Sequence, residues 1–238
     1  MIFRLGELFC GPGGLALGAK QAGFINDGNE FSIEHAWAND IDEDSCSTYR
    51  NNICPQKPET VICKDVRELK LSELASIDCF AYGFPCNDFS IVGEQKGFQG
   101  DYGPLYLHGV KIINHFKPKF FFAENVGGLA NANGGKAFRK ILSDLESSGD
   151  GYNLTVNLYK AEQYGIPQTR HRIIIIGISR NEGFYYKVPK PTHLLNQVTS
   201  REAIENPPIP FDTSNNELTK QSRIVEERLK YTLPGENA

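Results

Sequence analysis

Residues 3–14 read FRLGELFCGPGG, an apolar run of strand length followed by a loop in which three of four residues are glycine. The next stretch, Leu15–Ala22, has the composition of a helix. Glycines at a strand-to-helix turn permit a tight bend and let a ligand approach the backbone closely. Gly11, Gly13 and Ala16 also satisfy a loose G-x-G-x-x-A dinucleotide pattern. Considered alone, the loop fits either a nucleotide-like ligand or a simple tight turn.

Beyond this loop, short apolar runs alternate with helix-like stretches over most of the chain. This order predicts an α/β fold with a doubly wound, mostly parallel sheet. The predicted strands are Phe3–Phe9, Ile33–Asn39, Thr60–Cys63, Cys79–Gly83, Phe120–Glu124, Leu154–Tyr159 and Ile173–Ile178. The predicted helices are Leu15–Ala22, Asp42–Asn51, Glu68–Ala75, Leu105–His115 and Ala137–Ser147.

The character of the sequence changes after Gly183. Prolines interrupt the following segment, and polar residues dominate from Thr213 onwards, which leaves helical periodicity only over Glu217–Leu229. Such a segment gathers too few apolar residues for a core of its own. The sequence therefore predicts one domain over residues 1–183 and the start of a second region over residues 184–238.

The overall composition limits the possible partners. The 238 residues carry a formal net charge of −4, with 25 basic and 29 acidic residues. This balance argues mildly against DNA binding, because phosphate contacts usually need a basic surface. The six cysteines form no CxxC pair and show no histidine spacing typical of zinc, so no metal is predicted. No apolar run has the length of a membrane span and no signal peptide is visible, which predicts a cytoplasmic protein with no membrane partner.

Acidic residues follow the second and third predicted strands, at Asp40 and Asp65. Ligands of doubly wound sheets bind at the carboxyl ends of the strands. A carboxylate after the second strand can accept hydrogen bonds from ribose hydroxyls, and one after the third can accept from an adenine amino group. Either residue alone fits an exposed loop position. Because all three loops open on the same edge of the sheet, together they favour a nucleoside-containing ligand.

The fourth predicted strand leads into Pro85 and Cys86, and the fifth leads into Glu124 and Asn125. The preceding proline restricts the backbone, so Cys86 is held in place. A buried structural cysteine is the alternative for Cys86, and a helix or loop cap is the alternative for Glu124 and Asn125. If the two strands are neighbours, Cys86 and Glu124 face one cleft, which favours a catalytic pair.

Gln168, Arg170 and Arg172 alternate just before the last apolar run. An extended backbone would place all three side chains on one face. Guanidinium groups on that face suit a phosphate or a carbonyl oxygen. An ordinary solvated basic stretch is the alternative.

The order of these motifs resembles that of the DNA cytosine-5 methyltransferases. F-x-G-x-G-G, the acidic strand ends, P-C followed by F-S, E-N-V, and Q-x-R-x-R before a strand occur in the family's order between Phe3 and Ile178. P-C, E-N-V and Q-x-R-x-R together are far more specific than the glycine loop. The resemblance implies the Rossmann-like fold of S-adenosylmethionine-dependent methyltransferases, S-adenosyl-L-methionine as cofactor, double-stranded DNA as partner and a role in a restriction-modification system.

The same resemblance implies roles for particular residues. The S-adenosylmethionine pocket would be lined by Phe9, Gly11, Gly13, Asp40, Ile41, Asp65, Val66 and Leu105. The catalytic set would be the nucleophile Cys86, Glu124 at the N3 edge of the cytosine, Arg172 at its O2, and Arg170, which would help to position the DNA. Contacts to the substrate would come from Pro85, Asn87, Ser90, Asn125 and Gln168.

The implied chemistry gives each catalytic residue a task. Cytosine C5 is a poor nucleophile, so a thiolate adds at C6 and builds electron density at C5. Glu124 would hydrogen-bond or protonate N3, while Arg172 polarises O2. After C5 has taken the methyl group, loss of its proton and elimination of Cys86 restore the ring. The target base must leave the duplex to reach such a cleft.

The sequence departs from the family's pattern in three respects. Asn87 stands where the family usually has glutamine, and Val92 stands where some relatives have a small polar residue. After Ile178, the family's recognition domain and closing motifs are missing, and residues 199–204 resemble only the lead-in to them. Residues 184–238 are therefore expected to begin a variable target-recognition region.

A second polypeptide, or a longer chain, is expected to supply the missing motifs. On this interpretation an apolar patch remains exposed where that part docks, and the isolated chain binds DNA weakly and without sequence preference.

Three other interpretations are open from the sequence. The chain could be an RNA (tRNA) cytosine-5 methyltransferase, because relatives with similar motifs act on tRNA. It could be a non-catalytic DNA-binding fragment, although the presence of Cys86, Glu124 and Arg172 speaks against this. An NAD oxidoreductase is disfavoured, because that function gives no role to P-C, E-N-V or Q-x-R-x-R.

Overall fold

The computed structural model describes residues 1–85, 105–210, 212–213 and 220–233, except for the side chains of 131–133. It divides into two compact units, Met1–Gln197 and Val198–Ala238. The predicted functional boundary at residue 183 stays a prediction.

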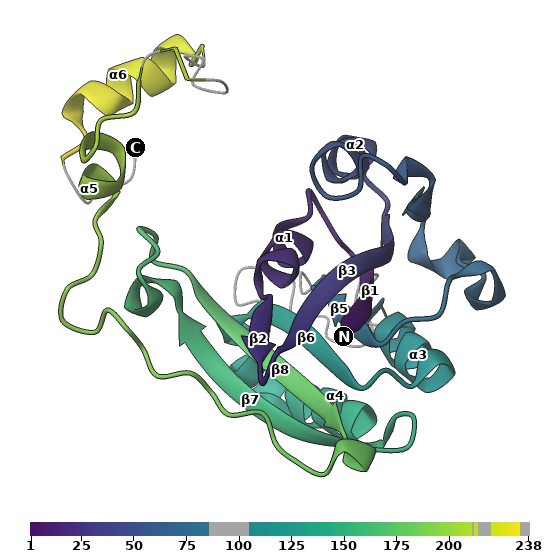
Figure 1. Ribbon diagram of the computed structural model, residues 1–238. Coiled ribbons are helices and arrows are strands. Elements are labelled where there is room, and N and C mark those ends of the chain that lie inside the picture. The colour runs from purple at the N-terminus through teal and green to yellow at the C-terminus, as the bar shows by residue number, and fades with distance from the viewer. Residues whose placement is uncertain (86–104, 211, 214–219, 234–238) are drawn as a thin grey trace. The chain divides into compact units, whose positions relative to one another are not determined.

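The first unit is built on one eight-stranded sheet, shown in Figure 1. Five strands are parallel, in the spatial order β4 (Val61–Cys63), β3 (Asn29–Asp40), β1 (Ile2–Leu8), β5 (Cys79–Tyr82), β6 (Phe120–Val126). The sheet continues with β8 and β7, where β8 is antiparallel to both of its neighbours; their bounds are His171–Ser179 and Tyr152–Lys160. The predicted α/β fold with a mostly parallel sheet is confirmed.

Helices cover both faces of this sheet. On one face lie α1 (Gly14–Gln21) and α2 (Glu43–Asn52), and on the other lie α3 (Tyr106–Phe116) and α4 (Lys136–Ser147). The strands alternate to match, because successive side chains point to opposite faces. In β5, for example, Cys79 and Ala81 join the core under α1 and α2, while Phe80 and Tyr82 join the core under α3 and α4.

The face that carries α1 also has an apolar hollow of about 470 Å³ beside this helix. Its walls include Leu15 of α1, Phe120 and Phe122 of β6, and Ile176 and Ile178 of β8. An exposed apolar patch of this kind was expected from the sequence. What covers it stays a prediction.

One predicted helix is wrong. Residues 68–75 do not form a helix but belong to two short 3-10 turns, Val66–Glu68 and Leu71–Glu73, joined by extended residues. The cause is the spacing of the leucines, since Leu69, Leu71 and Leu74 all pack against the core under α3. A helix would turn Leu69 and Leu71 to different sides, because residues two apart do not share a helix face.

The sequence prediction also missed β2 (Phe24–Asn26), which pairs with the start of β3 as an antiparallel hairpin. Asp27 and Gly28 form its turn with φ of 49° and 77°. An Asp-Gly pair with positive φ at both positions is typical of the tight turns that connect hairpin strands. The stacked rings of Phe24 and Phe31, with centroids 4.8 Å apart, close the pair.

The second unit contains α5 (Ser200–Glu205) and α6 (Arg223–Tyr231). Thr199 and Glu202 form a reciprocal capping box at the start of α5, which satisfies two backbone N–H groups. Neither helix buries a residue, as expected of a segment that gathers no core of its own. In the part of the chain that the structure describes, no helix is both long and apolar enough to cross a bilayer.

Candidate active site

The glycine loop after β1 has a backbone shape that few residues other than glycine adopt. Phe9, Gly11 and Gly13 all have positive φ, at 54°, 52° and 97°. A side chain at position 13 would lie 2.7 Å from Cγ1 of Ile53, so only glycine fits there. At position 11, by contrast, an added Cβ would meet no atom within 4 Å, so the loop is open on that side. The loop is therefore closed toward α2 at Gly13 and open at Gly11.

Asp40, at the end of β3, fixes this loop to the next one. Its carboxylate accepts hydrogen bonds from the backbone N–H of Gly11 (2.8 Å), Ile41 (2.8 Å) and Asp42 (3.1 Å). Beside it, the apolar side chain of Ile41 is 69% exposed. An exposed isoleucine next to an open glycine loop provides apolar surface for the flat face of a ligand.

Asp65 follows β4, the strand next to β3. Its carboxylate accepts from the backbone N–H of Arg67 at 2.9 Å and also pairs with the Arg67 guanidinium. These hydrogen bonds lower the pKa of Asp65 to about 2, so it is ionised at neutral pH. Val66, the next residue, is buried in the core to which Phe9 and Leu105 also pack. The predicted cofactor residues therefore gather at the ends of three adjacent strands and the start of α3.

Two of the four predicted catalytic residues, Glu124 and Arg172, meet further along the sheet, on β6 and β8. β5 and β6 are neighbours, as the pairing of Cys86 with Glu124 requires. Glu124 on β6 and Arg172 on the antiparallel β8 form an ion pair, with Oε1 and Nε 2.7 Å apart. Their side chains are 23% and 26% exposed, so the pair is accessible from solvent. Cys86, Asn87 and Ser90 lie outside the described residues.

The segment that leads from β5 to Cys86 is held against Glu124. A Cβ at Gly83 would lie 3.3 Å from Oε2 of Glu124, so the carboxylate rests on the bare backbone of this glycine. Asn125 is buried, and its side-chain amide donates to the carbonyl of Phe84 at 2.9 Å. Pro85 follows directly and is half-buried. A predicted contact of Pro85 or Asn125 with the substrate stays a prediction.

The predicted alternation of Gln168, Arg170 and Arg172 is wrong in its geometry. β8 begins only at His171, and Gln168 lies in a tight turn in which its N–H bonds the carbonyl of Ile166 at 2.8 Å. Gln168 and Arg170 are exposed in this loop, whereas Arg172 is in the strand and reaches Glu124. β7 ends at Lys160, a 3-10 turn follows over Ala161–Tyr164, and Gly165 ends that turn with a positive φ of 82°.

Sequence reasoning missed a buried polar cluster beneath the glycine loop. Glu7 on β1 and Tyr49 on α2 are fully buried and hydrogen-bonded to each other. The signal was visible in the opening stretch, where a glutamate interrupts an apolar strand. Buried acidic residues are uncommon and need a partner.

The mostly parallel sheet, the antiparallel β8 inserted before its edge, the glycine loop and the acidic strand ends define the fold class of S-adenosylmethionine-dependent methyltransferases. Residues 3–233 match the family of C-5 cytosine-specific DNA methylases. The chain belongs to this family.

Individual relatives agree with this assignment. The Type II methyltransferase M.BbvI of Brevibacillus brevis is 55% identical over 100% of this chain and 65% of its own length. M.NgoFVII of Neisseria gonorrhoeae, also a Type II methyltransferase, is 37% identical over 97% of this chain and 60% of its own. A crystal structure described as a prophage-encoded DNA modification methyltransferase from E. coli is 27% identical, with a TM-score of 0.65 over 85% of this chain and 54% of that one. The chain thus spans less than two thirds of these relatives.

Proposed function

We propose that this chain carries the cofactor-binding and base-binding part of a DNA cytosine-5 methyltransferase, which transfers a methyl group from S-adenosyl-L-methionine to C5 of cytosine in double-stranded DNA. The observation that carries the proposal is the Glu124–Arg172 pair, held beside Gly83 three residues before Cys86. A restriction-modification system is the proposed setting, because the relatives at 37% and 55% identity are Type II methyltransferases.

The residues around the glycine loop fit the proposed cofactor. The open side of Gly11 leaves room for close backbone approach, and the exposed side chain of Ile41 offers apolar surface to an adenine ring. Asp40 and Asp65 would accept hydrogen bonds from the ribose and adenine, in the positions where doubly wound folds hold such groups. When bound, S-adenosylmethionine supplies a methyl group on a positively charged sulfur.

The chain's own residues would then act on the base. The Cys86 thiolate bonds to C6 of the flipped cytosine, and the electrons of the C5–C6 double bond become available at C5. Glu124, in its protonated form, donates a hydrogen bond to N3 or transfers its proton there, and Arg172 polarises O2, so each stabilises charge that develops on the ring. Once C5 is methylated, its proton is lost, the C6–sulfur bond breaks and the double bond is restored.

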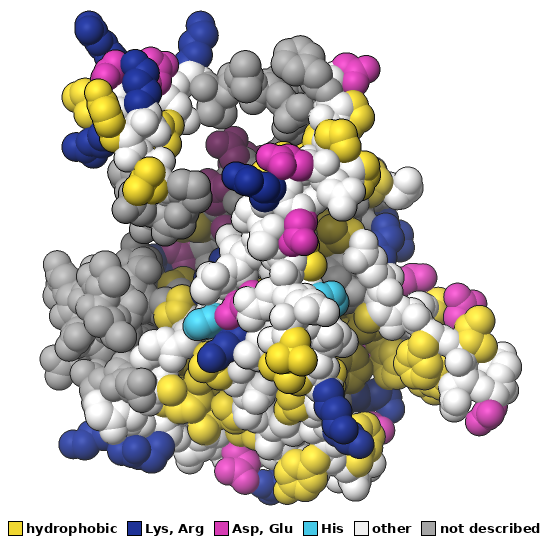
Figure 2. All heavy atoms as spheres, turned by 90° about the vertical axis from the view of Figure 1, so that its left-hand side faces the viewer, with side chains coloured by type: hydrophobic (Ala, Val, Ile, Leu, Met, Phe, Trp, Pro, Cys, Tyr) yellow, Lys and Arg dark blue, Asp and Glu magenta, His cyan; other side chains and the backbone are white. Residues whose placement is uncertain are grey.

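Binding to duplex DNA needs more basic surface than these residues provide. The net charge is −4, and on the face that Figure 2 presents, the basic side chains of the described residues form separate groups. We therefore propose that the recognition segment, from a longer chain or a second polypeptide, supplies further phosphate contacts. The cytoplasm, where bacterial DNA lies, is the proposed location. RNA methylation and simple DNA binding are not favoured, because the matching family is one of DNA methylases.

A covalent trapping assay tests the proposed function. Duplex DNA that contains 5-fluorocytosine is incubated with S-adenosylmethionine and the chain, with and without a polypeptide that carries the recognition part. We expect a covalent protein–DNA adduct in the assembled enzyme, and no adduct with Cys86→Ser. Cys54→Ala is the control, since Cys54 is buried under α2, away from Glu124. An adduct of normal yield with Cys86→Ser would refute the assignment of the nucleophile.

A further inference from the structure

Glu7 is a buried carboxyl group directly beneath the glycine loop. It lies in β1, two residues before Phe9, and is 0% exposed. Its Oε2 accepts a hydrogen bond from the Tyr49 hydroxyl at 3.0 Å, while its Oε1 has no partner in the described part of the chain. A half-satisfied carboxyl in a core is destabilising, so its presence calls for a functional reason.

The hydrogen bond between Glu7 and Tyr49 is the buried end of a series of hydrogen-bonded side chains. The Tyr49 hydroxyl lies 3.1 Å from Nδ1 of His35 on β3, and Nε2 of His35 lies 2.7 Å from Oγ1 of Thr60. Thr60 in turn reaches the carbonyl of Lys57 at 2.6 Å. Four side chains thus connect β1 to the turn before β4, and we call them the Tyr49 bridge.

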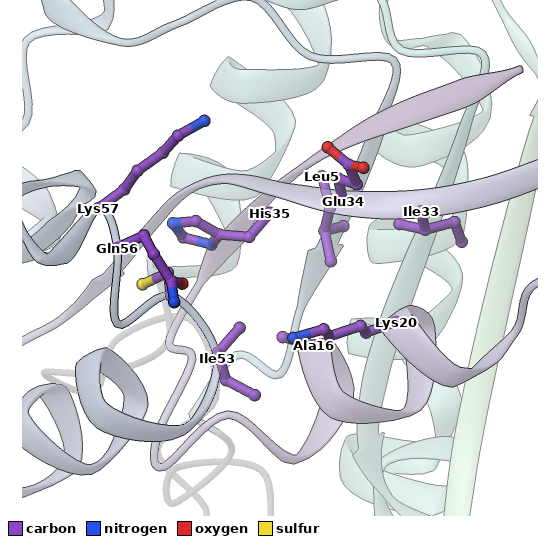
Figure 3. A pocket seen from close by; sticks show the side chains of 10 residues that line it. Leu5, Ala16, Lys20, Ile33, Glu34, His35, Ile53, Gln56 and Lys57 are labelled. Carbon is purple, nitrogen blue, oxygen red and sulfur yellow. The ribbon is translucent and has the colours of Figure 1, made fainter.

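His35, in the outer part of the Tyr49 bridge, lines a cavity of about 270 Å³. Figure 3 shows His35 at this cavity, between Ile53 and Lys57. The buried carboxyl is therefore linked, through Tyr49 and His35, to a site that solvent can reach.

Tyr49 also touches the glycine loop itself. A Cβ placed on Gly13 would lie 3.0 Å from Cδ2 of Tyr49, so the tyrosine ring forms the floor of the loop. The same residue therefore supports Gly13 by its ring and Glu7 by its hydroxyl. Removing the hydroxyl would loosen the strand that leads into the loop while leaving the ring in place.

We propose that Tyr49 is a positioning residue for the cofactor site, and that the Tyr49 bridge couples the order of the glycine loop to a proton on Glu7. This inference rests on the proposed function, because it assigns the ligand of the loop. No residue of the bridge needs to touch the cofactor.

The bridge has two hydrogen-bond directions. With Glu7 ionised, Tyr49 donates to Glu7, His35 Nδ1–H donates to Tyr49, and Thr60 must donate to Nε2 and release the Lys57 carbonyl. With Glu7 protonated, the carboxyl can donate to Tyr49, Tyr49 to Nδ1, and Nε2–H to Thr60, which keeps its bond to Lys57. Losing the Glu7 proton therefore reverses the three hydrogen bonds between Glu7 and Thr60 and breaks the one from Thr60 to the Lys57 carbonyl.

The surroundings of Glu7 place this reversal near pH 8. Burial raises the pKa of Glu7 to about 8, the Tyr49 hydrogen bond works against this, and the Asp40 carboxylate adds to it. Burial, with a contribution from Lys57, lowers the pKa of His35 to about 4, so His35 is neutral throughout. Burial also raises the pKa of the Cys10 thiol, which therefore brings no charge to this site.

The charge of the ligand should act on this equilibrium. Glu7 already senses the carboxylate of Asp40, which is part of the proposed cofactor site. A cation bound there favours ionised Glu7, so by linkage the affinity for S-adenosylmethionine rises as pH increases through about 8. S-adenosylhomocysteine has the same amino and carboxyl groups but no sulfonium charge. Its affinity should therefore change less with pH than that of S-adenosylmethionine.

Tyr49→Phe tests the positioning role, with Tyr152→Phe as the matched control. Tyr152 is equally buried, and its hydroxyl donates one hydrogen bond, to the Pro118 carbonyl at 2.7 Å, far from the loop in sequence. Amide hydrogen exchange of residues 9–14 is measured first, because it needs no ligand. We expect exchange about tenfold faster in Tyr49→Phe and unchanged in Tyr152→Phe, as the loss of one buried hydrogen bond implies. Equal exchange in the two variants would overturn the proposal.

If Tyr49→Phe does not fold, Thr60→Val is the second test. Valine keeps the shape of threonine but removes the hydroxyl that bonds to His35 at the outer end of the bridge. It should also speed exchange of the loop, by a smaller factor. Unchanged exchange in Thr60→Val would then count against the bridge.

Calorimetric titration between pH 6.5 and 9 tests the proton coupling. The wild-type chain should show a steeper rise of affinity with pH for S-adenosylmethionine than for S-adenosylhomocysteine, and Glu7→Gln should abolish the difference. Equal slopes in the wild type would refute the coupling. If the chain binds neither ligand while loop exchange still responds to Tyr49→Phe, the proposed function fails, and only the ordering of the loop by Tyr49 stands.

Discussion

Two halves of the sheet hold their functional groups in different ways. In the half proposed to bind the cofactor (the cofactor half: β1, β3, β4, α1 and α2), Asp40 binds three backbone N–H groups and glycines shape the loop. In the half proposed to bind the base (the base half: β5, β6 and β8), two charged side chains pair with each other and remain about one quarter exposed. A site fixed by backbone suits a ligand that is always the same. Two side chains that are paired with each other can break this ion pair and bind a base that enters the site instead.

Glu124→Gln should give the largest effect of the three substitutions. This effect should fall on the chemical step in the base half and not on cofactor binding. Glutamine keeps the shape but cannot act as an acid, so we expect the chemical step to slow roughly 100-fold or more. Cofactor affinity should stay within about twofold, since β6 lies outside the cofactor half. Single-turnover kinetics in the assembled enzyme and calorimetry measure the two quantities. Glu182→Gln, which removes a surface partner of Lys119, is the control. An unchanged chemical rate would remove Glu124 from the mechanism.

Gly13→Ala should weaken cofactor binding by about tenfold and leave the chemical step almost unchanged, which is the reverse of the pattern expected for Glu124→Gln. The new methyl group would clash with Ile53, and a φ of 97° strains any residue with a Cβ, by about 1–3 kcal/mol. We expect weaker S-adenosylmethionine binding and a lower melting temperature, with a nearly normal chemical step at saturating cofactor. Gly18→Ala in α1 is the control, because its Cβ meets nothing within 4 Å and alanine favours the helix. Normal cofactor affinity in Gly13→Ala would contradict the assignment of this loop.

Gly83→Ala should give the smallest effect and tests the contact between backbone and side chain in the base half. Its methyl group would press on Glu124 at 3.3 Å, which a carboxylate can relieve by a small shift. We expect the chemical step to slow about three- to tenfold, because catalytic geometry is sensitive to displacements of this size. In a Glu124→Gln background the same substitution should have much less effect, since coupled residues are not additive. Full additivity would show that Gly83 acts elsewhere.

Much of the site could be predicted because it lies where strands end. Asp40, Asp65 and Glu124 each follow or finish an apolar run, and parallel strands bring such positions to one edge. Whether β5 and β6 are neighbours was left open by the sequence, and the structure shows that they are. Such positions can be predicted from the sequence because they depend only on which residues are buried and which form turns.

Features that depend on distant contacts could not be predicted in this way. Residues 68–75 were predicted to be helical, yet Leu69, Leu71 and Leu74 all pack against the same core, which their spacing would not allow in a helix. The ion pair of Glu124 and Arg172 depends on β8 being antiparallel, which no local pattern specifies. Glu7 stood out as a charge in an apolar run, but its partner Tyr49 lies 42 residues further along the chain.

The position of β1 in the centre of the sheet has a consequence for synthesis of the chain. β1 pairs with β3 on one side, but its other partner, β5, is made much later. At translation rates of about 5–20 residues per second the interval lasts on the order of several seconds. During it, the second edge of β1 presents unpaired backbone groups to any neighbouring nascent chain. Glu7 places an inward-pointing acidic residue in that edge, and inward charges of this kind discourage pairing between strands of different molecules.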